Sequence, residues 1–284
     1  FIVSSKSFTT DETIENLKKA FEWSGNKRNF IAITANPNEV KKFGIKDVIF
    51  FDKEIGGRYS IWSPVTQFHL CGEIRKSFLK GGHKADIDML ENNEYINFIK
   101  RISFTDILLN NNGKNVRAVL SYIWNLRSLP TYFQQLEMES LGKQSSPKSD
   151  YKHTGQIIFG GYGPTAQHSY FQLLHQGTQE ICADIISTSV DEQSLSVAQA
   201  ITQSKLLANG ENEIQLENKF KINGNVPTNL FLMKKFNAFN LGYLIATWEY
   251  RTFITATMLD INPFDQFGVN AAKIYTKQYL ASKD

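Results

Sequence analysis

The chain opens with FIVSSKSFTTDET, residues 1–13, which has the pattern of a strand, a loop and the start of a helix. Residues 1–3 are apolar and β-like, and a cluster of hydroxyl side chains follows them. Thr9 and Glu12 have the spacing of a capping box, so we predict that a helix begins here. A strand that leads directly into a helix is typical of α/β folds.

Similar strand-like runs recur along the chain. They are short and almost continuously apolar, which is typical of strands buried on both faces, and they lie at residues 1–3, 30–34, 48–51, 156–159 and 183–187. Helical patterns lie between several of them, at residues 12–23, 116–126 and 195–208. The sequence therefore predicts an α/β fold in which helices cover mainly parallel sheets.

Within the predicted helix 116–126, an apolar stripe at helical spacing is assigned to the core: Val116, Val119, Leu120 and Ile123. Residues 141–150 and 209–225 are predicted to be loops, because they are rich in Gly, Ser, Asn and Pro. The Gly56-Gly57 turn and Pro64 interrupt the pattern before a mainly helical stretch. We therefore expect a domain boundary near residue 65.

The composition is that of a globular protein with a full core. The chain has 284 residues, of which 42% are hydrophobic, enough for one large or two ordinary domains. The net charge is +3, and the 31 basic and 28 acidic residues are scattered rather than gathered into a patch. We therefore expect neither nucleic acid nor a membrane surface as a partner.

The two cysteines, Cys71 and Cys182, lie far apart with no His or Cys at ligand spacing. This argues against a disulfide framework and a structural zinc site, and it favours a reducing compartment. The most apolar stretch, residues 240–259, contains Glu249 and Arg251, so no transmembrane helix is expected. The N-terminus lacks an initiator Met and the pattern of a signal peptide, which predicts that the chain begins inside a fold.

The hydroxyl-rich loop, residues 4–13, is a candidate phosphate site. A helix N-terminus attracts anions through its unpaired N–H groups and its dipole, and Lys6 adds a positive charge. Asp11 and Glu12 place negative charge nearby, which opposes an anion. The alternative is a well-capped helix that binds nothing.

Two further motifs contain groups suited to acid–base chemistry. Arg58 follows the Gly56-Gly57 turn, where a backbone can approach a ligand closely and a guanidinium offers a permanent cation. Glu139 lies near a predicted helix end, where partial burial raises the pKa of a carboxyl group toward that of a proton-abstracting base. The alternatives are an ordinary turn with a solvated arginine and a glutamate at a loop edge.

Two pairs of polar residues are separated by two helical turns and so can share a face: His168 with His175, and Gln266 with Lys273. His168 follows a glycine-rich loop and is a candidate acid or base, with a hydrogen-bonded packing histidine as the alternative. Two histidines without nearby ligands at metal-binding spacing do not predict a metal site. Gln266 and Lys273 can equally be solvated surface residues.

Taken in order, these motifs resemble the glucose-6-phosphate isomerase family. The matching stretches are residues 4–13, 56–63, 134–143, 167–178 and 262–273, and the resemblance spans the whole chain. It implies two three-layer α/β/α sugar-isomerase (SIS) domains, of which residues 1–65 form the last part of the first and residues 66–284 form the second with C-terminal helices. It also implies a cytoplasmic homodimer that interconverts glucose 6-phosphate and fructose 6-phosphate in glycolysis and gluconeogenesis, with no metal and no organic cofactor.

The resemblance assigns a role to each motif. Ser5, Lys6, Ser7 and Thr10 would bind the phosphate, and Gln135 and Gln266 would hold sugar or phosphate oxygens. His168, assisted by Lys273, would open the sugar ring and would serve the partner subunit's site. Glu139 would move a proton between C2 and C1 through a cis-enediol, and Arg58 would stabilise the negative charge on the enediolate.

The sequence also departs from the family pattern. Ser7 replaces the usual Thr, Asp11 replaces a common Gln, and the loop 161–166 lacks the usual Glu and Asn. A segment that precedes residue 1 in full members is expected to be missing, with the other wall of the phosphate site, so we predict weak or absent activity for the chain alone. The alternatives to an enzyme are a non-catalytic sugar-phosphate-binding module, an inactive fragment or an extracellular interaction protein.

Overall fold

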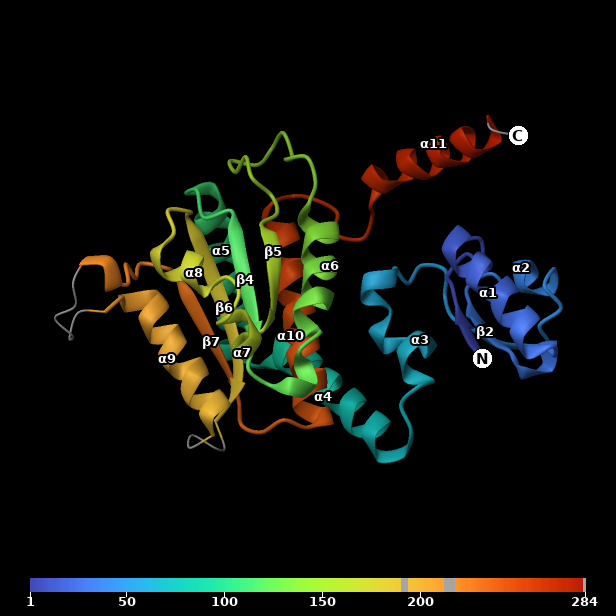
Figure 1. Ribbon diagram of the computed structural model, residues 1–284, viewed down its shortest axis with the longest axis horizontal. Helices are drawn as coiled ribbons and strands as arrows, with labels where there is room; N and C mark the ends of the chain where they lie inside the picture. Colours follow the sequence, from blue (N-terminus) through green and yellow to red (C-terminus); the bar gives the residue numbers. More distant parts are fainter. Residues whose placement is uncertain (190–193, 212–217, 283–284) are drawn as a thin grey trace. The chain divides into compact units, whose positions relative to one another are not determined.

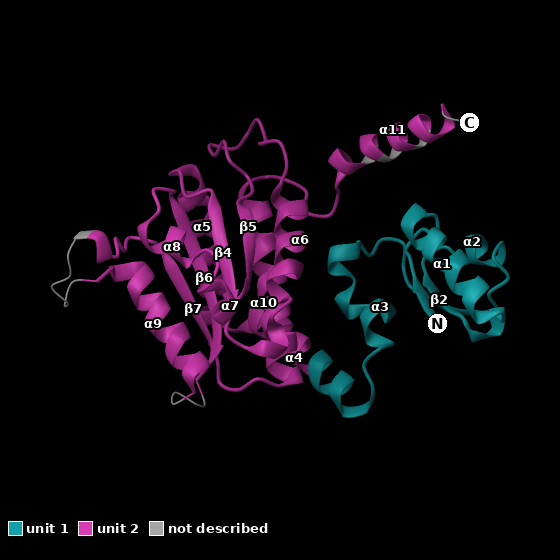
Figure 2. Ribbon diagram, in the orientation of Figure 1, with its two compact units in different colours: residues 1–79 teal, residues 80–284 magenta. Residues whose placement is uncertain are grey.

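A computed structural model describes residues 1–189, 194–211 and 218–282 of the chain. The chain divides into two compact units, Phe1–Leu79 and Lys80–Asp284 (Figure 2). The boundary predicted near residue 65 falls inside the first unit, and the assignment of the two parts to SIS domains stays a prediction. The predicted α/β class with parallel sheets is confirmed, because every strand pair that the structure describes is parallel.

The first unit contains a three-stranded sheet of order β1-β2-β3 within its described residues (Figure 1). Its elements are β1 (Ile2–Ser4), α1 (Asp11–Ser24), η1 (Lys27–Asn29), β2 (Ile31–Thr34), α2 (Pro37–Lys41) and β3 (Asp47–Phe50). An aromatic and aliphatic core cluster lies in this part of the unit: Phe8, Leu17, Phe30, Ala32, Val40 and Ile45. Thr34 of β2 is also buried, and its hydroxyl donates to the Lys6 carbonyl oxygen at 3.1 Å. The predicted strands 1–3, 30–34 and 48–51 therefore exist, with ends shifted by one residue.

The capping box predicted at Thr9 and Glu12 does not form. Helix α1 begins one residue later, with Thr10 as its N-cap, and no described side chain caps it. The Thr9 hydroxyl instead donates to the Ser7 hydroxyl at 2.8 Å. Thr9 therefore lies one residue before the N-cap position, and its hydroxyl bonds within the loop.

Short helices continue the first unit after its sheet. They are η2 (Gly57–Trp62) and α3 (Pro64–Gln67), and the long helix α4 (Gly72–Glu91) begins in the first unit and ends in the second. The Ser63 hydroxyl accepts a hydrogen bond from Val65 N at 3.3 Å and caps α3, which has Pro64 at its first position. The predicted mainly helical stretch after Pro64 is thereby confirmed.

The second unit contains a four-stranded sheet of order β5-β4-β6-β7 in its described part. Its elements are α5 (Asn93–Asn111), β4 (Val116–Ser121), η3 (Trp124–Leu126), α6 (Leu129–Leu141), β5 (Ile157–Tyr162), α7 (Gly163–Ala166), α8 (Phe171–Gln176), β6 (Ile181–Thr188), α9 (Leu195–Asn209), η4 (Asn218–Phe220), β7 (Thr228–Met233), α10 (Ala238–Met258), η5 (Phe267–Val269) and α11 (Asn270–Ala281). Helix α9 ends at Asn209 and is followed by Gly210, whose φ of 73° is readily adopted only by glycine.

The two faces of this sheet have different chemistry, because side chains alternate along each strand. Ala118 and Leu120 of β4 pack with residues of α8 and α9 in an apolar cluster. Arg117 of β4 and Asp184 of β6 lie on the opposite face and make ion pairs with residues of α5, α6 and α10. Helices α9 and α10 therefore cover opposite faces, and the charged groups lie under α10.

The prediction of a helix at residues 116–126 is wrong, because Val116–Ser121 form strand β4. This strand pairs with both β5 and β6, so it lies inside the sheet. The assignment of its apolar side chains to the core is correct, since Val119 and Leu120 are fully buried. Strand β7 was not predicted.

Within the described residues, the two predicted loops agree with the structure apart from one short helix. Residues 142–150 contain no helix or strand after α6 ends at Leu141. The predicted loop 209–225 contains the short helix η4, and its residues 212–217 lie outside the described part. Among the helices that the structure describes, none combines the length and apolar character needed to cross a membrane.

Candidate active site

The hydroxyl-rich loop of the first unit connects β1 to α1 and is closed by its own side chains. The hydroxyls of Ser5 and Thr10 lie 3.3 Å apart, and the Ser5 hydroxyl accepts a hydrogen bond from Phe8 N at 3.1 Å. Ser5 is buried, whereas Lys6, Ser7 and Thr10 are exposed. The structure thus gathers all four predicted phosphate ligands in one loop.

Phe8 fixes the shape of this loop. Its φ is 55°, a left-handed conformation that a bulky residue adopts only when the surroundings impose it. Its ring is 1% exposed and packs edge-on against Phe43 at 5.6 Å. Burial of Phe8 therefore holds the loop in a turn, with Lys6 and Ser7 on the exposed side.

The N-terminus of α1 suits an anion in one respect and opposes it in another. No described side chain caps the helix, so its first N–H groups are directed at whatever lies beyond Thr10. Asp11 and Glu12 are exposed in the first turn, where their negative charges offset part of the positive potential at the helix N-terminus. A dianionic phosphate would therefore depend on Lys6 as well as on the helix dipole.

Arg58 lies in η2 and is 2% exposed, so it is not the solvated arginine of the alternative interpretation. Its guanidinium carbon lies 5.6 Å from the centre of the Tyr59 ring. A Cβ added to Gly56 or Gly57 would meet no heavy atom within 4 Å, and neither has a positive φ. Packing within the chain therefore does not demand glycine in this turn.

Glu139 and Gln266 line the same cavity in the second unit, and its volume is about 540 Å³. One wall is the C-terminal end of α6 with the residues just after it, and the other is residues 265–269. Gln135, one turn before Glu139, donates from Nε2 to Glu139 Oε1 at 3.4 Å. The cavity therefore brings together a carboxylate and amides, which can accept a proton and hold hydroxyl groups.

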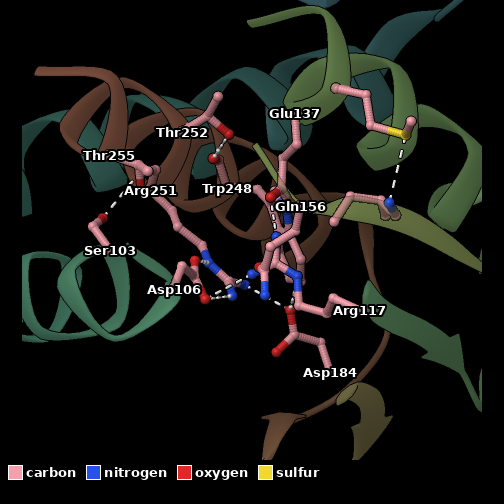
Figure 3. Close-up of polar contacts among 12 residues, drawn as sticks. Ser103, Asp106, Arg117, Glu137, Gln156, Asp184, Trp248, Arg251, Thr252 and Thr255 are labelled. Carbon is pink, nitrogen blue, oxygen red and sulfur yellow. Dashed lines mark hydrogen bonds and ion pairs between the residues drawn. The ribbon is translucent and has the colours of Figure 1, made fainter. Parts of the chain in front are cut away.

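A buried ionic network lies beneath α6 (Figure 3). In the part of the chain that the structure describes, two arginines meet three acids: Arg117, Arg251, Asp106, Glu137 and Asp184. Arg117 contacts Asp106 at 2.7 Å and also pairs with Glu137. Arg251 contacts Asp106 at 2.6 Å and Asp184 at 2.8 Å. All five are almost fully buried.

The network fixes α6 from below. The Trp248 indole N–H donates to Glu137 Oε1 at 2.6 Å, and the Trp248 ring stacks on Phe133 of α6 with centroids 3.9 Å apart. Glu137 and Glu139 are two positions apart along the helix, with only Met138 between them, so their side chains leave it in roughly opposite directions. The network thus holds the helix whose other side presents Glu139 to the cavity.

The pKa values of two carboxyl groups in the network are shifted in opposite directions. Burial raises the pKa of Glu137, and the attraction of Arg117 does not offset it. Burial also raises the pKa of Asp106, but Arg117 and Arg251 outweigh this effect, and the net pKa is lowered. The sequence predicted partial burial of Glu139, and the structure has this side chain half-buried, whereas Glu137 of the same helix is fully buried.

The two histidines do not share one helix. His168 is exposed in the turn between α7 and α8, whereas His175 is half-buried in α8, with Nε2 2.8 Å from Gln203 Oε1. Burial lowers the pKa of His175. His175 is therefore a hydrogen-bonded packing histidine, whereas His168, for which the sequence left that alternative open, is exposed to solvent.

Lys273 lies in α11, and its side chain is outside the described part of the structure. The predicted residues divide between the units: Ser5, Lys6, Ser7, Thr10 and Arg58 belong to the first, and Gln135, Glu139, His168, Gln266 and Lys273 belong to the second.

Sequence reasoning missed Lys143, although it closes the motif 134–143. It lines the cavity and contacts both of its walls. Its position one turn after Glu139, at a predicted helix end, was a signal for contact with the last carbonyl groups of the helix.

Comparisons with known proteins cover the whole chain. A family model described as phosphoglucose isomerase matches residues 1–283. A glucose-6-phosphate isomerase of Hydrogenovibrio crunogenus is 34% identical over 329 residues, which cover 100% of this chain and 60% of that protein. One of Legionella pneumophila (strain Paris) is 35% identical over 300 residues, covering 100% of this chain and 59% of that protein.

Solved structures give the same result. The crystal structure of a glucose-6-phosphate isomerase from Chlamydia trachomatis matches with a TM-score of 0.86 and 27% identity, over 99% of this chain and 59% of that chain. A hypothetical protein from Thermus thermophilus shares the fold, with a TM-score of 0.80 and 22% identity, over 99% of this chain and 71% of that chain. The chain thus spans about 60% of the length of the first curated relatives it matches.

Proposed function

The chain belongs to the phosphoglucose isomerase family, and we propose that it acts in an aldose–ketose isomerase that interconverts glucose 6-phosphate and fructose 6-phosphate. The family match over residues 1–283 supports the reaction. The single structural observation that carries the proposal is the cavity lined by both Glu139 and Gln266. We further propose that the enzyme is cytoplasmic and serves glycolysis and gluconeogenesis.

The phosphate group of the substrate binds the loop between β1 and α1. Ser5, Ser7 and Thr10 supply hydroxyl donors, Lys6 supplies charge, and the N–H groups at the start of α1 complete the site. The turn imposed by buried Phe8 supports this role, because the loop is shaped before the ligand arrives.

The exposed His168, with Lys273, opens the sugar ring by moving a proton between the ring oxygen and the anomeric hydroxyl. Glu139 then takes the proton from C2 of the open aldose, and the electron pair of that C–H bond forms the cis-enediol. Glu139 returns this proton to C1, and a second proton moves from the C2 hydroxyl to the C1 oxygen, so that C1 carries a hydroxyl and C2 becomes the ketone. The carboxylate is regenerated, and no net proton is consumed.

Arg58 stabilises the charge that develops on the enediolate oxygen, while Gln135 and Gln266 orient sugar or phosphate oxygens. Burial of Arg58 supports this role, because a cation in a water-poor environment stabilises a developing negative charge more strongly than a solvated one. We also propose a homodimer in which His168 serves the site of the partner subunit.

The test is Glu139→Gln in the longest natural form of the chain. The variant keeps the shape and hydrogen bonding of the side chain but removes the base, so kcat should fall at least about 100-fold. Binding of fructose 6-phosphate, followed by calorimetry, should stay within about threefold of the parent. The same change at exposed Glu91, the last residue of α4, is the matched control and should leave both quantities unchanged.

An undiminished kcat in Glu139→Gln would refute the assignment of Glu139 as the base. A parent protein that binds fructose 6-phosphate without turning it over would instead indicate the alternative function, a non-catalytic sugar-phosphate-binding module. No binding and no turnover would contradict both functions.

A further inference from the structure

Lys143 lies one turn beyond Glu139, just past the end of α6 at Leu141. Its ammonium group donates a hydrogen bond to the backbone carbonyl oxygen of Glu139 at 2.7 Å. The last carbonyl groups of a helix lack partners within it, and a lysine at this end also complements the helix dipole. Lys143 therefore holds the part of the helix that carries Glu139.

The same ammonium group contacts the opposite wall of the cavity. It donates to the backbone carbonyl oxygen of Asp265 and lies 3.1 Å from Asp265 Oδ1. Asp265 directly precedes Gln266, and both residues line the cavity with Glu139 and Lys143. One cation thus joins the segment that carries Glu139 to the segment that carries Gln266.

Lys143 is itself firmly held. Its carbonyl oxygen accepts a hydrogen bond from the Thr154 hydroxyl at 2.8 Å, and its side chain is only 16% exposed. A Cβ added to the preceding Gly142 would lie 2.4 Å from the carbonyl oxygen of Met138, so the chain can pass here only with glycine. The position of the ammonium group is therefore set by the fold.

We propose that Lys143 is a positioning residue that fixes the separation of Glu139 and Gln266 across the cavity. The inference rests on the proposed isomerase function and assigns a further residue to that site. Lys143 acts through the two backbone segments and does not touch the substrate. Because the phosphate is bound by the loop of the first unit, loss of Lys143 lowers turnover more than substrate binding.

The competing interpretation is an ordinary ion pair that contributes only to stability. A partly exposed pair of this kind contributes little to global stability. The two interpretations differ in what Lys143→Met changes. A positioning residue alters the local order of residues 265–269 and the value of kcat, whereas an ordinary ion pair alters neither beyond the general stability of the unit.

The first experiment is hydrogen–deuterium exchange on the 284-residue chain, which needs no activity. Lys143→Met should accelerate exchange of the amides of residues 265–269 about tenfold, because hydrogen bonds from a charged donor are lost there. The amides of β6 should not change. Lys148→Met, an exposed lysine of the same loop, is the matched control and should leave residues 265–269 as in the parent.

The second experiment measures isomerisation in the longest natural form of the chain. Lys143→Met should lower kcat about 10- to 100-fold and change KM by less than about threefold. Asp265→Asn keeps the backbone acceptor and removes only the carboxylate contact, so its loss of kcat should be smaller. Adding Asp265→Asn to Lys143→Met should cause no further loss, because both changes remove the same interaction.

Unchanged exchange at residues 265–269 would overturn the proposal, and so would equal acceleration at β6, which indicates general destabilisation. An unchanged kcat or a selective rise in KM would also overturn it. If the parent protein does not isomerise the substrate, the proposed function fails, and the exchange result still decides whether Lys143 joins the two segments.

Discussion

The core cluster around the sheet β1-β2-β3 is aromatic and aliphatic, whereas one face of the sheet β5-β4-β6-β7 carries Arg117 and Asp184, which make ion pairs with charged residues of α5, α6 and α10. Apolar packing is non-directional and tolerates small shifts of the elements. Buried ion pairs tolerate much less, because a displaced charge is left without water or a partner. The second sheet therefore specifies how α5, α6 and α10 are arranged more tightly than apolar packing alone would.

This difference matches the chemistry proposed for each unit. The first unit presents a loop of neutral hydroxyls and one lysine, and a mobile phosphate group can adjust to it. The second unit presents Glu139, which must approach one carbon atom within a narrow range of distance and angle. Glu137, on the other side of the same helix, is held by Arg117 and by Trp248 N–H.

The strongest test of the comparison is Arg251→Met. The change leaves Asp106 and Asp184 buried with too little positive charge, and we expect it to lower the free energy of unfolding by about 4 kcal/mol. Urea unfolding followed by circular dichroism measures this loss. The same change at exposed Arg101 of α5 is the control. A loss below about 1 kcal/mol would show that the charges do not specify the second sheet.

In the first unit the corresponding test is Leu17→Ala. Leu17 of α1 is 2% exposed in an apolar cluster, so the loss of methyl groups and the cavity left behind should lower the free energy of unfolding by about 3 kcal/mol. Hydrogen exchange of the β2 amides reports on this unit, and the β6 amides serve as an internal reference. Exposed Lys18→Ala is the control. Equal acceleration at β2 and β6 would mean that the two sheets unfold together.

A smaller effect is expected from Glu137→Gln, and it depends on pH. An ordinary glutamate titrates near 4.5, and the pKa of Glu137 is raised by burial. The folded protein therefore binds the proton more tightly and loses stability as pH rises from about 4.5 through the folded pKa. The variant lacks this loss, so the parent should lose stability relative to it over this range. Urea unfolding at several pH values, with Glu91→Gln as control, tests the sign.

The smallest effect is expected at the surface of the first unit. Lys42 pairs with Glu39 at 2.7 Å, and both side chains contact solvent. Lys42→Ala should lower the free energy of unfolding by only about 0.5 kcal/mol, and this loss should shrink as salt is added. A loss as large as that of Arg251→Met would remove the distinction between surface and buried charge on which the comparison depends.

The strands of the first sheet could be predicted from the sequence because local patterns determine them. Residues 1–3, 30–34 and 48–51 are short apolar runs with helices or turns between them, and parallel strands of this kind have a recognisable composition. The order of the site motifs was also visible. Each motif alone is ambiguous, but several separate motifs in a fixed order indicate a family.

Strand β4 could not be identified in this way, and the reason lies in Arg117. Its apolar neighbours fit both the spacing of a helix and a buried strand, and a charge is not expected in a strand that is buried on both faces. Arg117 is 1% exposed because acids from α5, α6 and β6 surround it. These partners are distant in sequence, so no local pattern reveals that the charge is buried.

The same limit applies to the site. Glu139 and Gln266 were identified separately, but the cavity that they share is lined by two segments far apart in the chain, both of which Lys143 contacts. The capping box at Thr9 failed because α1 begins one residue later than the spacing predicted, with Thr10 at the N-cap position.

The ionic network also determines when, during translation, the charged face of the second sheet can fold. Asp106, Arg117, Glu137 and Asp184 all emerge before Arg251. Until α10 has been synthesised, the nascent chain carries three acids of the network against one arginine, and burying them together would leave excess negative charge without water. Strand β4 also emerges before both of its neighbours, β5 and β6. The charged face should therefore close only after translation of α10, so that a chain stalled in α9 exposes an unfinished sheet to chaperones and proteases.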